Sequence, residues 1–169
     1  MTVFSIRLVN HTKATPRLQG AIETHLQDLF NQVFVGTSDS ATVGWGTAVA
    51  ADSIVIHLVD DIADSYLQQK MPGNTIRADG GGHTRLRGKV TGSEIYLHPV
   101  IGGRRTMVQD RAYAKIAFHE ALHNQWPGWS NQEIHAKDGM ATSPPGDQLS
   151  ADNKTFMRRG MAIKNQQLL

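Results

Sequence analysis

The chain has 169 residues, and its 17 lysines and arginines nearly balance its 15 aspartates and glutamates. This length suits one domain with a proper hydrophobic core, so we expect a single domain over residues 1–169. The 40% hydrophobic and 19% charged residues are ordinary globular values, which argues against global disorder. Cysteine is absent, which excludes disulfides, thiol catalysis and thiolate metal ligands.

The sequence shows no targeting or membrane-spanning segment. The start, MTVFSIRLVNHTKATP, lacks a basic region followed by a long apolar run, so it does not match a Sec signal peptide. No stretch approaches the roughly 18 apolar residues that a membrane span requires. We therefore expect a soluble protein that is cytoplasmic or exported by a route without such a signal.

Basic residues gather at three places in the second half of the chain. They are Arg85, Arg87 and Lys89, then the pairs at 104–105 and 158–159. In the first cluster the charges alternate with uncharged residues, as on the wet face of an exposed strand. This pattern favours a solvated face over a nucleic-acid groove, which stays the alternative.

The first part of the chain predicts three extended segments and one long helix. Residues 2–10 alternate as a first strand, and residues 41–50 are expected to be extended. Between them, Thr15-Pro16 supplies a hydroxyl cap and a first-turn proline for a helix that ends at Gly36. Residues 53–59 form a near-continuous β-branched run, typical of a central strand buried on both faces. The apolar stripe of the helix is Leu18, Ile22, Leu26, Leu29, Phe30 and Val33.

The middle of the chain predicts a loop and a hairpin. Residues 71–83 are expected to be loop, including the run Asp79-Gly80-Gly81-Gly82. That run lacks the GK[ST] ending of a phosphate loop, so we discard nucleotide binding. Residues 84–90 and 93–98 predict two strands joined by a tight turn at Thr91-Gly92.

Two helices are expected in the last third. Thr106 and Gln109 form a capping box for a helix that runs to about Gln125, where Pro127-Gly128 stops it. A loop and a proline turn follow. Ser150 then caps a last helix, whose inward-facing residues are Phe156, Met157 and Met161. The order of elements (strand, helix, three or four strands, helix, loop, helix) predicts an α+β fold.

The first of these two helices carries the motif HExxH, as His119-Glu120-Ala121-Leu122-His123. Two histidines four residues apart lie on one face of a helix, so both imidazoles can bind one zinc ion. Glu120 is rotated by about 100° from His119 and flanks the ion without binding it. There it can accept a proton from zinc-bound water and return it to a leaving amine. A catalytic site also needs a third ligand, and His135, Glu133 and Asp138 are available downstream.

With this motif, the sequence resembles the metzincin zinc metallopeptidases. Residues 106–160 carry the likeness, and the expected topology extends it to most of the chain. It implies a zincin-type domain: a small mixed sheet, an N-terminal helix, the active-site helix and a C-terminal helix. Met140, in HAKDGMA, matches the methionine turn beneath the metal. The segment LSADNKTFMRRG at 149–160 resembles the closing helix of matrixin-like members. By the same likeness, the strand at 93–98 would pair with an extended peptide substrate.

The segment after the second histidine departs from that family. Its usual motif, HExxHxxGxxH, would place glycine and histidine where this chain has Trp126 and Trp129. The next histidine, His135, follows His123 by twelve residues, and we assign it as the third ligand across a longer loop. No tyrosine follows Met140, so the family's tyrosine donor is not carried over.

Three alternatives to this interpretation remain open. SprT-like proteases, which act on proteins attached to DNA, also have HExxH followed by a histidine after a longer gap. A gluzincin-type site would use Glu133 as a ligand. A non-catalytic zinc-stabilised module would fill the fourth position with protein, for example with Asp138. We nevertheless expect a zinc-dependent endopeptidase with a protein or peptide substrate.

Several aromatic residues and further histidines are candidates for the substrate cleft or for the core. Tyr96 and Trp129 are candidates for the substrate cleft, although tryptophans beside a helix end, such as Trp126 and Trp129, are more often core residues. His57, inside a buried strand, is expected to be a hydrogen-bonded core histidine. Two further histidines could line the cleft, but ordinary strand-end or loop positions are favoured for them; they are His83 and His98.

Overall fold

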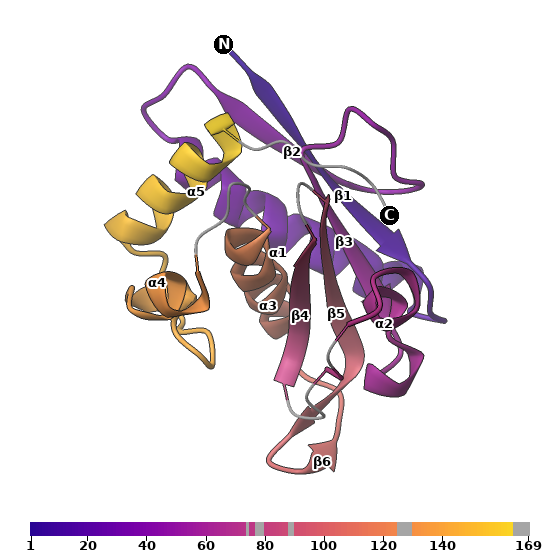
Figure 1. Cartoon of the computed structure of the whole chain (residues 1–169). Helices are drawn as coiled ribbons and strands as arrows, with labels where there is room; N and C mark the ends of the chain where they lie inside the picture. The colour runs from indigo at the N-terminus through magenta and orange to yellow at the C-terminus, as the bar shows by residue number, and fades with distance from the viewer. Residues whose placement is uncertain (74, 77–79, 88–89, 125–129, 164–169) are drawn as a thin grey trace.

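The structure is a computed structural model that describes residues 1–73, 75–76, 80–87, 90–124 and 130–163. It shows a mixed α+β domain built around one sheet, as the sequence predicted (Figure 1). The strands in chain order are β1 (Val3–Asn10), β2 (Ser40–Trp45), β3 (Ile54–Val59), β4 (Gly80–Arg87), β5 (Val90–Ile101) and β6 (Arg104–Arg105). The helices are α1 (Pro16–Phe34), α2 (Tyr66–Lys70), α3 (Asp110–His123), α4 (Asn131–His135) and α5 (Ala151–Ile163), with short 3-10 turns η1 (Ile62–Asp64) and η2 (Gly139–Ala141).

The described strands form a sheet in the order β2-β1-β3-β5-β4, with β6 paired to the end of β5. The pairs β1–β2, β1–β3 and β3–β5 are parallel, whereas β4 runs antiparallel to β5. The expectation that residues 93–98 would offer a strand to a peptide is therefore wrong. From Ser93 to Ile95, β5 is already paired with β3 on one side and β4 on the other. β4 is the last strand at this end of the sheet order.

The helices α1 and α3 pack together against one face of the sheet, and α5 packs against both of them (Figure 1). The whole apolar stripe predicted for α1 is buried in the main core between these helices and the sheet. The Thr15 hydroxyl caps α1 by accepting a hydrogen bond from the Leu18 amide at 3.2 Å. All six residues of β3 are buried, which confirms it as a central strand.

The opposite face of the sheet is covered in part by α2, which the sequence did not predict. On β5, the Glu94 side chain accepts a hydrogen bond from the Leu67 amide of α2 at 3.0 Å. The neighbouring Ser93 side chain instead contacts α3, where Asn124 donates to its hydroxyl at 2.8 Å. Because successive side chains of a strand point to opposite faces, α2 and α3 lie on opposite sides of β5.

The structure corrects the predicted hairpin. Gly80, Gly81 and Gly82 belong to β4 rather than to a loop. Thr91 and Gly92 lie within β5, where they pair with residues of β4, so they do not form the turn. The connection between these strands, at residues 88–89, lies outside the described residues.

The boundaries of α3 also differ from the expectation. Gln109 precedes the helix without a side-chain cap, and the Thr106 hydroxyl donates to the Met107 carbonyl instead, so the predicted capping box is wrong. The helix ends at His123, two residues before the predicted end. The expected stop at Pro127-Gly128 lies outside the described residues.

The C-terminal part agrees with the prediction for the last helix and corrects the preceding loop. The Ser150 hydroxyl accepts a hydrogen bond from the Asn153 amide at 3.1 Å, at the start of α5. Met157 and Met161 are buried, and Phe156 packs against the core. The expected loop contains the short helix α4. None of the described helices has the length and hydropathy needed to cross a membrane.

Candidate metal centre

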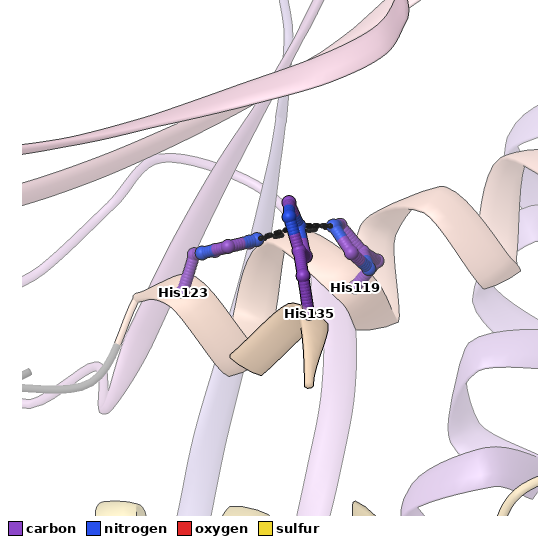
Figure 2. A group of neighbouring side chains, drawn as sticks. All are labelled: His119, His123 and His135. Carbon is purple, nitrogen blue, oxygen red and sulfur yellow. Dashed lines mark hydrogen bonds between the residues drawn. The ribbon is translucent and has the colours of Figure 1, made fainter. Parts of the chain in front are cut away.

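Three histidines converge beside the sheet, two from α3 and one from α4. The Nε2 atoms of His119 and His123 lie 3.0 Å apart, and that of His135 lies 3.2 Å from each of them (Figure 2). The i, i+4 spacing of HExxH places the first two on one face of α3. The structure therefore confirms that these three residues, across a longer loop than in HExxHxxGxxH, are close enough to hold one metal ion.

The geometry of the three nitrogens fits a tetrahedrally bound ion. Zinc–nitrogen bonds of about 2.0–2.1 Å at tetrahedral angles hold ligand nitrogens roughly 3.3 Å apart, close to the observed separations. His119 Nδ1 lies 2.9 Å from the Met140 carbonyl oxygen, which can only accept a hydrogen bond. In the neutral ring Nδ1 then carries the proton, and Nε2 presents its lone pair to the other two rings. Imidazole donors suit zinc and several other transition metals.

Burial favours the neutral form of these rings. Burial, with smaller contributions from neighbouring imidazoles, lowers the pKa of His119 to about 4 and the pKa of His123 to about 3. The carbonyl of Met140 opposes this shift in His119. Burial also lowers the pKa of His135. Since neutral histidine is the metal-binding form, the cluster is in a ligand-ready state at neutral pH.

The turn η2 orients His119 through the backbone carbonyl of Met140. Met140 is 1% exposed, and its backbone amide donates to Asn153 Oδ1 at 2.9 Å. The Asn153 amide group in turn donates to the Asp138 carbonyl at 2.9 Å. The Met140 carbonyl thus lies against the His119 ring, and α5 supports the turn through Asn153.

The two other candidate ligands lie elsewhere. The Glu133 carboxylate accepts a hydrogen bond from the Ser130 amide at 2.6 Å, which closes a capping box at the start of α4. Its carboxylate is exposed and serves that helix end. Asp138 does not belong to the described group of side chains that could share one ion. His135 is therefore the third residue of the cluster.

Glu120 is buried next to the three histidines. It is 6% exposed, and its Oε2 accepts a hydrogen bond from the Thr84 hydroxyl at 2.6 Å. Burial, with a smaller contribution from the charge of Glu94, raises the pKa of Glu120 to about 8 against the opposing effect of the Thr84 hydrogen bond. A carboxyl group with such a pKa is suited to exchanging protons near neutral pH.

A cleft of about 1270 Å³ opens onto these residues. His119, Glu120, His123 and His135 line it together with β4, and Pro144 lies among its further lining residues. This volume is more than a small molecule needs. The arrangement joins three histidines that are close enough to hold a metal ion, a buried carboxyl group and an open cleft.

The glycines of β4 allow this strand to lie directly on α3. A Cβ atom on Gly81 would come within 2.5 Å of Ile116 Cδ1, and one on Gly82 within 2.9 Å of Glu120 Cγ. The sequence predicted a loop at these glycines and no role for Thr84 in the site. A glycine run next to alternating residues is the signal that could have indicated a close approach of backbone to a helix.

The remaining candidates lie away from the cluster or outside the described residues. Tyr96 is 3% exposed and donates to Glu94 Oε1 at 2.9 Å, so its predicted place in the cleft is wrong. His57 is confirmed as a core residue, with its Nδ1 2.9 Å from His11 Nε2. His83 lines the cleft from β4, whereas His98 lies beside Arg105. Trp126 and Trp129 are not among the described residues.

Comparisons of the chain with protein-family models, with curated proteins and with solved structures found no match.

Proposed function

We propose that the chain is a zinc-dependent endopeptidase in which His119, His123 and His135 bind the ion and Glu120 is the general base. The observation that carries the proposal is the convergence of three imidazole Nε2 atoms within 3.2 Å beside a buried carboxyl group. The contact between His119 and the Met140 carbonyl supports a metzincin-like relationship. The longer interval between His123 and His135 is the feature that a SprT-like protease would share.

The donor set supports a catalytic ion over a purely structural one. Among the described residues, three side chains and no fourth gather at the cluster. A structural zinc site fills all four positions with protein, whereas a catalytic site leaves one open. The open side faces a cleft large enough for an extended peptide.

The roles of the chain's own groups follow from their positions. A bound zinc ion would act as a Lewis acid that polarises a carbonyl group and acidifies water. Glu120 takes a proton from the water molecule whose oxygen adds to the peptide carbonyl carbon. As the C–N bond breaks, Glu120 delivers that proton to the leaving amine nitrogen. The buried setting of Glu120 keeps its proton affinity high enough for both transfers.

Replacement of Glu120 by glutamine tests this mechanism. Glu120→Gln keeps the shape of the side chain and removes its basicity, so we expect kcat to fall by about 10²- to 10⁴-fold. Zinc content, measured by atomic absorption, should remain near one ion per chain because Glu120 is not a ligand. Glu23→Gln, on α1 and outside the lining of the cleft, is the matched control and should keep full activity. Peptide cleavage by Glu120→Gln at the wild-type rate would contradict the proposal.

A further inference from the structure

Two residues of β4 lie against the Glu120 side chain. Thr84 Oγ1 lies 2.6 Å from Glu120 Oε2 and 3.2 Å from the Glu120 backbone carbonyl oxygen. On the same strand, a Cβ atom at Gly82 would lie 2.9 Å from Glu120 Cγ and 3.1 Å from Oε1. The missing side chain of Gly82 thus makes room for the carboxyl group, and the Thr84 hydroxyl holds one of its oxygens.

The Thr84 hydroxyl is the end of a hydrogen-bonded chain that starts on α3. The Asn124 amide group donates to Ser93 Oγ at 2.8 Å, and Ser93 Oγ lies 2.8 Å from Thr84 Oγ1. On its other side, the Asn124 amide oxygen accepts a hydrogen bond from the Thr91 hydroxyl at 2.9 Å. Ser93, Asn124 and Thr91 are each at most 1% exposed, so these groups are withdrawn from water.

The direction of this chain follows from its two ends. When Glu120 is ionised, as a general base must be, its carboxylate can only accept, so the single hydroxyl proton of Thr84 points at Glu120 Oε2. Ser93 Oγ accepts a hydrogen bond from the Asn124 amide group, and its own hydroxyl donates to Thr84 or, at 3.3 Å, to the Glu120 carbonyl. With Glu120 in this ionised form, every donor of the chain points toward it. Buried networks whose members are all satisfied rigidify the groups that they join.

We propose that Thr84 is the positioning residue of Glu120. It fixes Oε2, so that the second oxygen, Oε1, meets the water and the leaving amine. Among the described residues, Thr84 is the side chain that donates a hydrogen bond to the Glu120 carboxyl group, and this bond goes to Oε2. This inference rests on the proposed peptidase function for its kinetic consequence, whereas its geometric part stands on the chain alone.

Two substitutions of Thr84 separate positioning from packing. Thr84→Val keeps the volume and removes the hydroxyl, and Thr84→Ser keeps the hydroxyl and removes the methyl group. For the zinc-loaded protein we expect Thr84→Val to lower kcat by about 10- to 100-fold, a usual effect of losing such a supporting partner, while KM and zinc content stay unchanged. Thr84→Ser should restore most of kcat. A purely structural role would give equal losses in the two variants.

Crystal structures of the same proteins without metal supply a readout that needs no catalysis. We expect the Glu120 carboxyl group to keep its place in Thr84→Ser and to leave it in Thr84→Val. Wild-type kcat in Thr84→Val, or an unmoved Glu120 in its structure, would overturn the inference. If Thr84→Val does not fold, Thr84→Ala takes its place with the same expected results.

The two proposals fail in different ways. A zinc-loaded wild-type protein that cleaves no peptide would contradict the proposed function, and a displaced Glu120 in Thr84→Val would still support positioning by Thr84. An active wild-type protein with full kcat in Thr84→Val would contradict the positioning role alone.

Discussion

Asn153 is the residue through which the last helix reaches the histidine cluster. Its Oδ1 accepts hydrogen bonds from the amides of Met140 at 2.9 Å and Ser150 at 3.2 Å, and Met140 holds His119. Outer partners of metal ligands commonly contribute about 10- to 100-fold to metal affinity. We expect Asn153→Ala to weaken zinc binding by about that factor, measured by competition with a chromophoric chelator. Asn153→Asp keeps the acceptor oxygens and should lose less.

The outcome against this prediction is an unchanged zinc affinity in Asn153→Ala. In that case the turn would hold its shape without Asn153, for example through the contact of the Gly146 amide with the Gly139 carbonyl at 3.0 Å.

At the residue scale, local spacing predicted the cluster and missed its supports. The histidine and glutamate positions of α3 follow from the helical repeat, and His135 was the nearest downstream histidine. Thr84, by contrast, meets Glu120 across 36 residues, and Asn153 meets Met140 across 13. Such contacts depend on which strand lies on which helix, and no periodic pattern in one sequence encodes that.

At the scale of elements, the packing of β4 on α3 depends on glycine. A Cβ atom at Gly82 would meet the Glu94 carbonyl oxygen at 2.8 Å as well as Glu120, and backbone cannot move aside cheaply. We expect Gly82→Ala to lower the free energy of unfolding by about 1–3 kcal/mol, the range of overpacked positions, and to lower kcat as Glu120 shifts. Urea unfolding and peptide cleavage measure the two effects.

Gly20 is the matched control, because it lies in α1 with nothing within 4 Å of its Cβ position. Gly20→Ala should raise the free energy of unfolding by about 0.5–1 kcal/mol, since alanine restricts the unfolded chain and favours helix. Equal stability of Gly82→Ala and the wild-type protein would show that β4 can withdraw from α3.

Elements with a strong local pattern were predicted, and those fixed by distant contacts were not. The signals for α1 and β3 lie within each element: a cap and an apolar stripe for α1, and a β-branched run for β3. Both elements were therefore predicted with nearly correct bounds. The start of β4 consists of glycines, which normally break strands, so it was assigned to a loop. The five-residue helix α4 is too short for a periodic signal, and it is held by its capping box and the buried Ile134.

At the scale of the whole molecule, the sheet face opposite the cluster carries a pH-sensitive pair. The His57 ring is stacked on Tyr66 at 4.1 Å and hydrogen-bonded to His11, and Glu94 acts on His11 from the same face. Burial, with a smaller contribution from the charge of His11, lowers the pKa of His57 to about 3. In the unfolded chain the pKa of histidine is about 6.5. Between these two pKa values the unfolded state binds a proton that the folded state does not. The contribution of His57 to the free energy of unfolding is therefore fully present above about pH 6.5 and is lost as the pH falls.

One such proton changes the free energy of unfolding by about 1.4 kcal/mol per pH unit. His57→Gln removes the titrating ring and keeps a side chain that can hydrogen-bond. We therefore expect the variant to lose less stability than the wild-type protein between pH 6.5 and pH 5, as measured by urea unfolding of the metal-free proteins. The same loss in both proteins would show that the His57 ring becomes protonated without unfolding.

Removal of the metal tests whether the whole fold depends on the cluster. The main core joins the sheet to α1, α3 and α5, and in α3 it contains Tyr113, Phe118 and Leu122, so two of the three ligands stand on an element held by packing. A bound ion present at 100 to 1,000 times its dissociation constant adds about 3–4 kcal/mol to stability, or roughly 5–15 °C in Tm for a domain of this size. Chelation should therefore lower Tm by that amount and leave the circular dichroism at 25 °C unchanged.

After chelation, the loss of protection from hydrogen exchange should be confined to one part of the chain. Only His135 reaches the cluster from α4, a helix of five residues whose buried contact is Ile134. Hydrogen exchange should therefore accelerate in residues 131–135 and remain slow in β3. Collapse of the near-ultraviolet signal on chelation, with recovery on addition of zinc, would instead identify a structural ion that the fold requires. Because a catalytic ion has an open position and a structural one does not, this measurement distinguishes the two classes of site without any substrate.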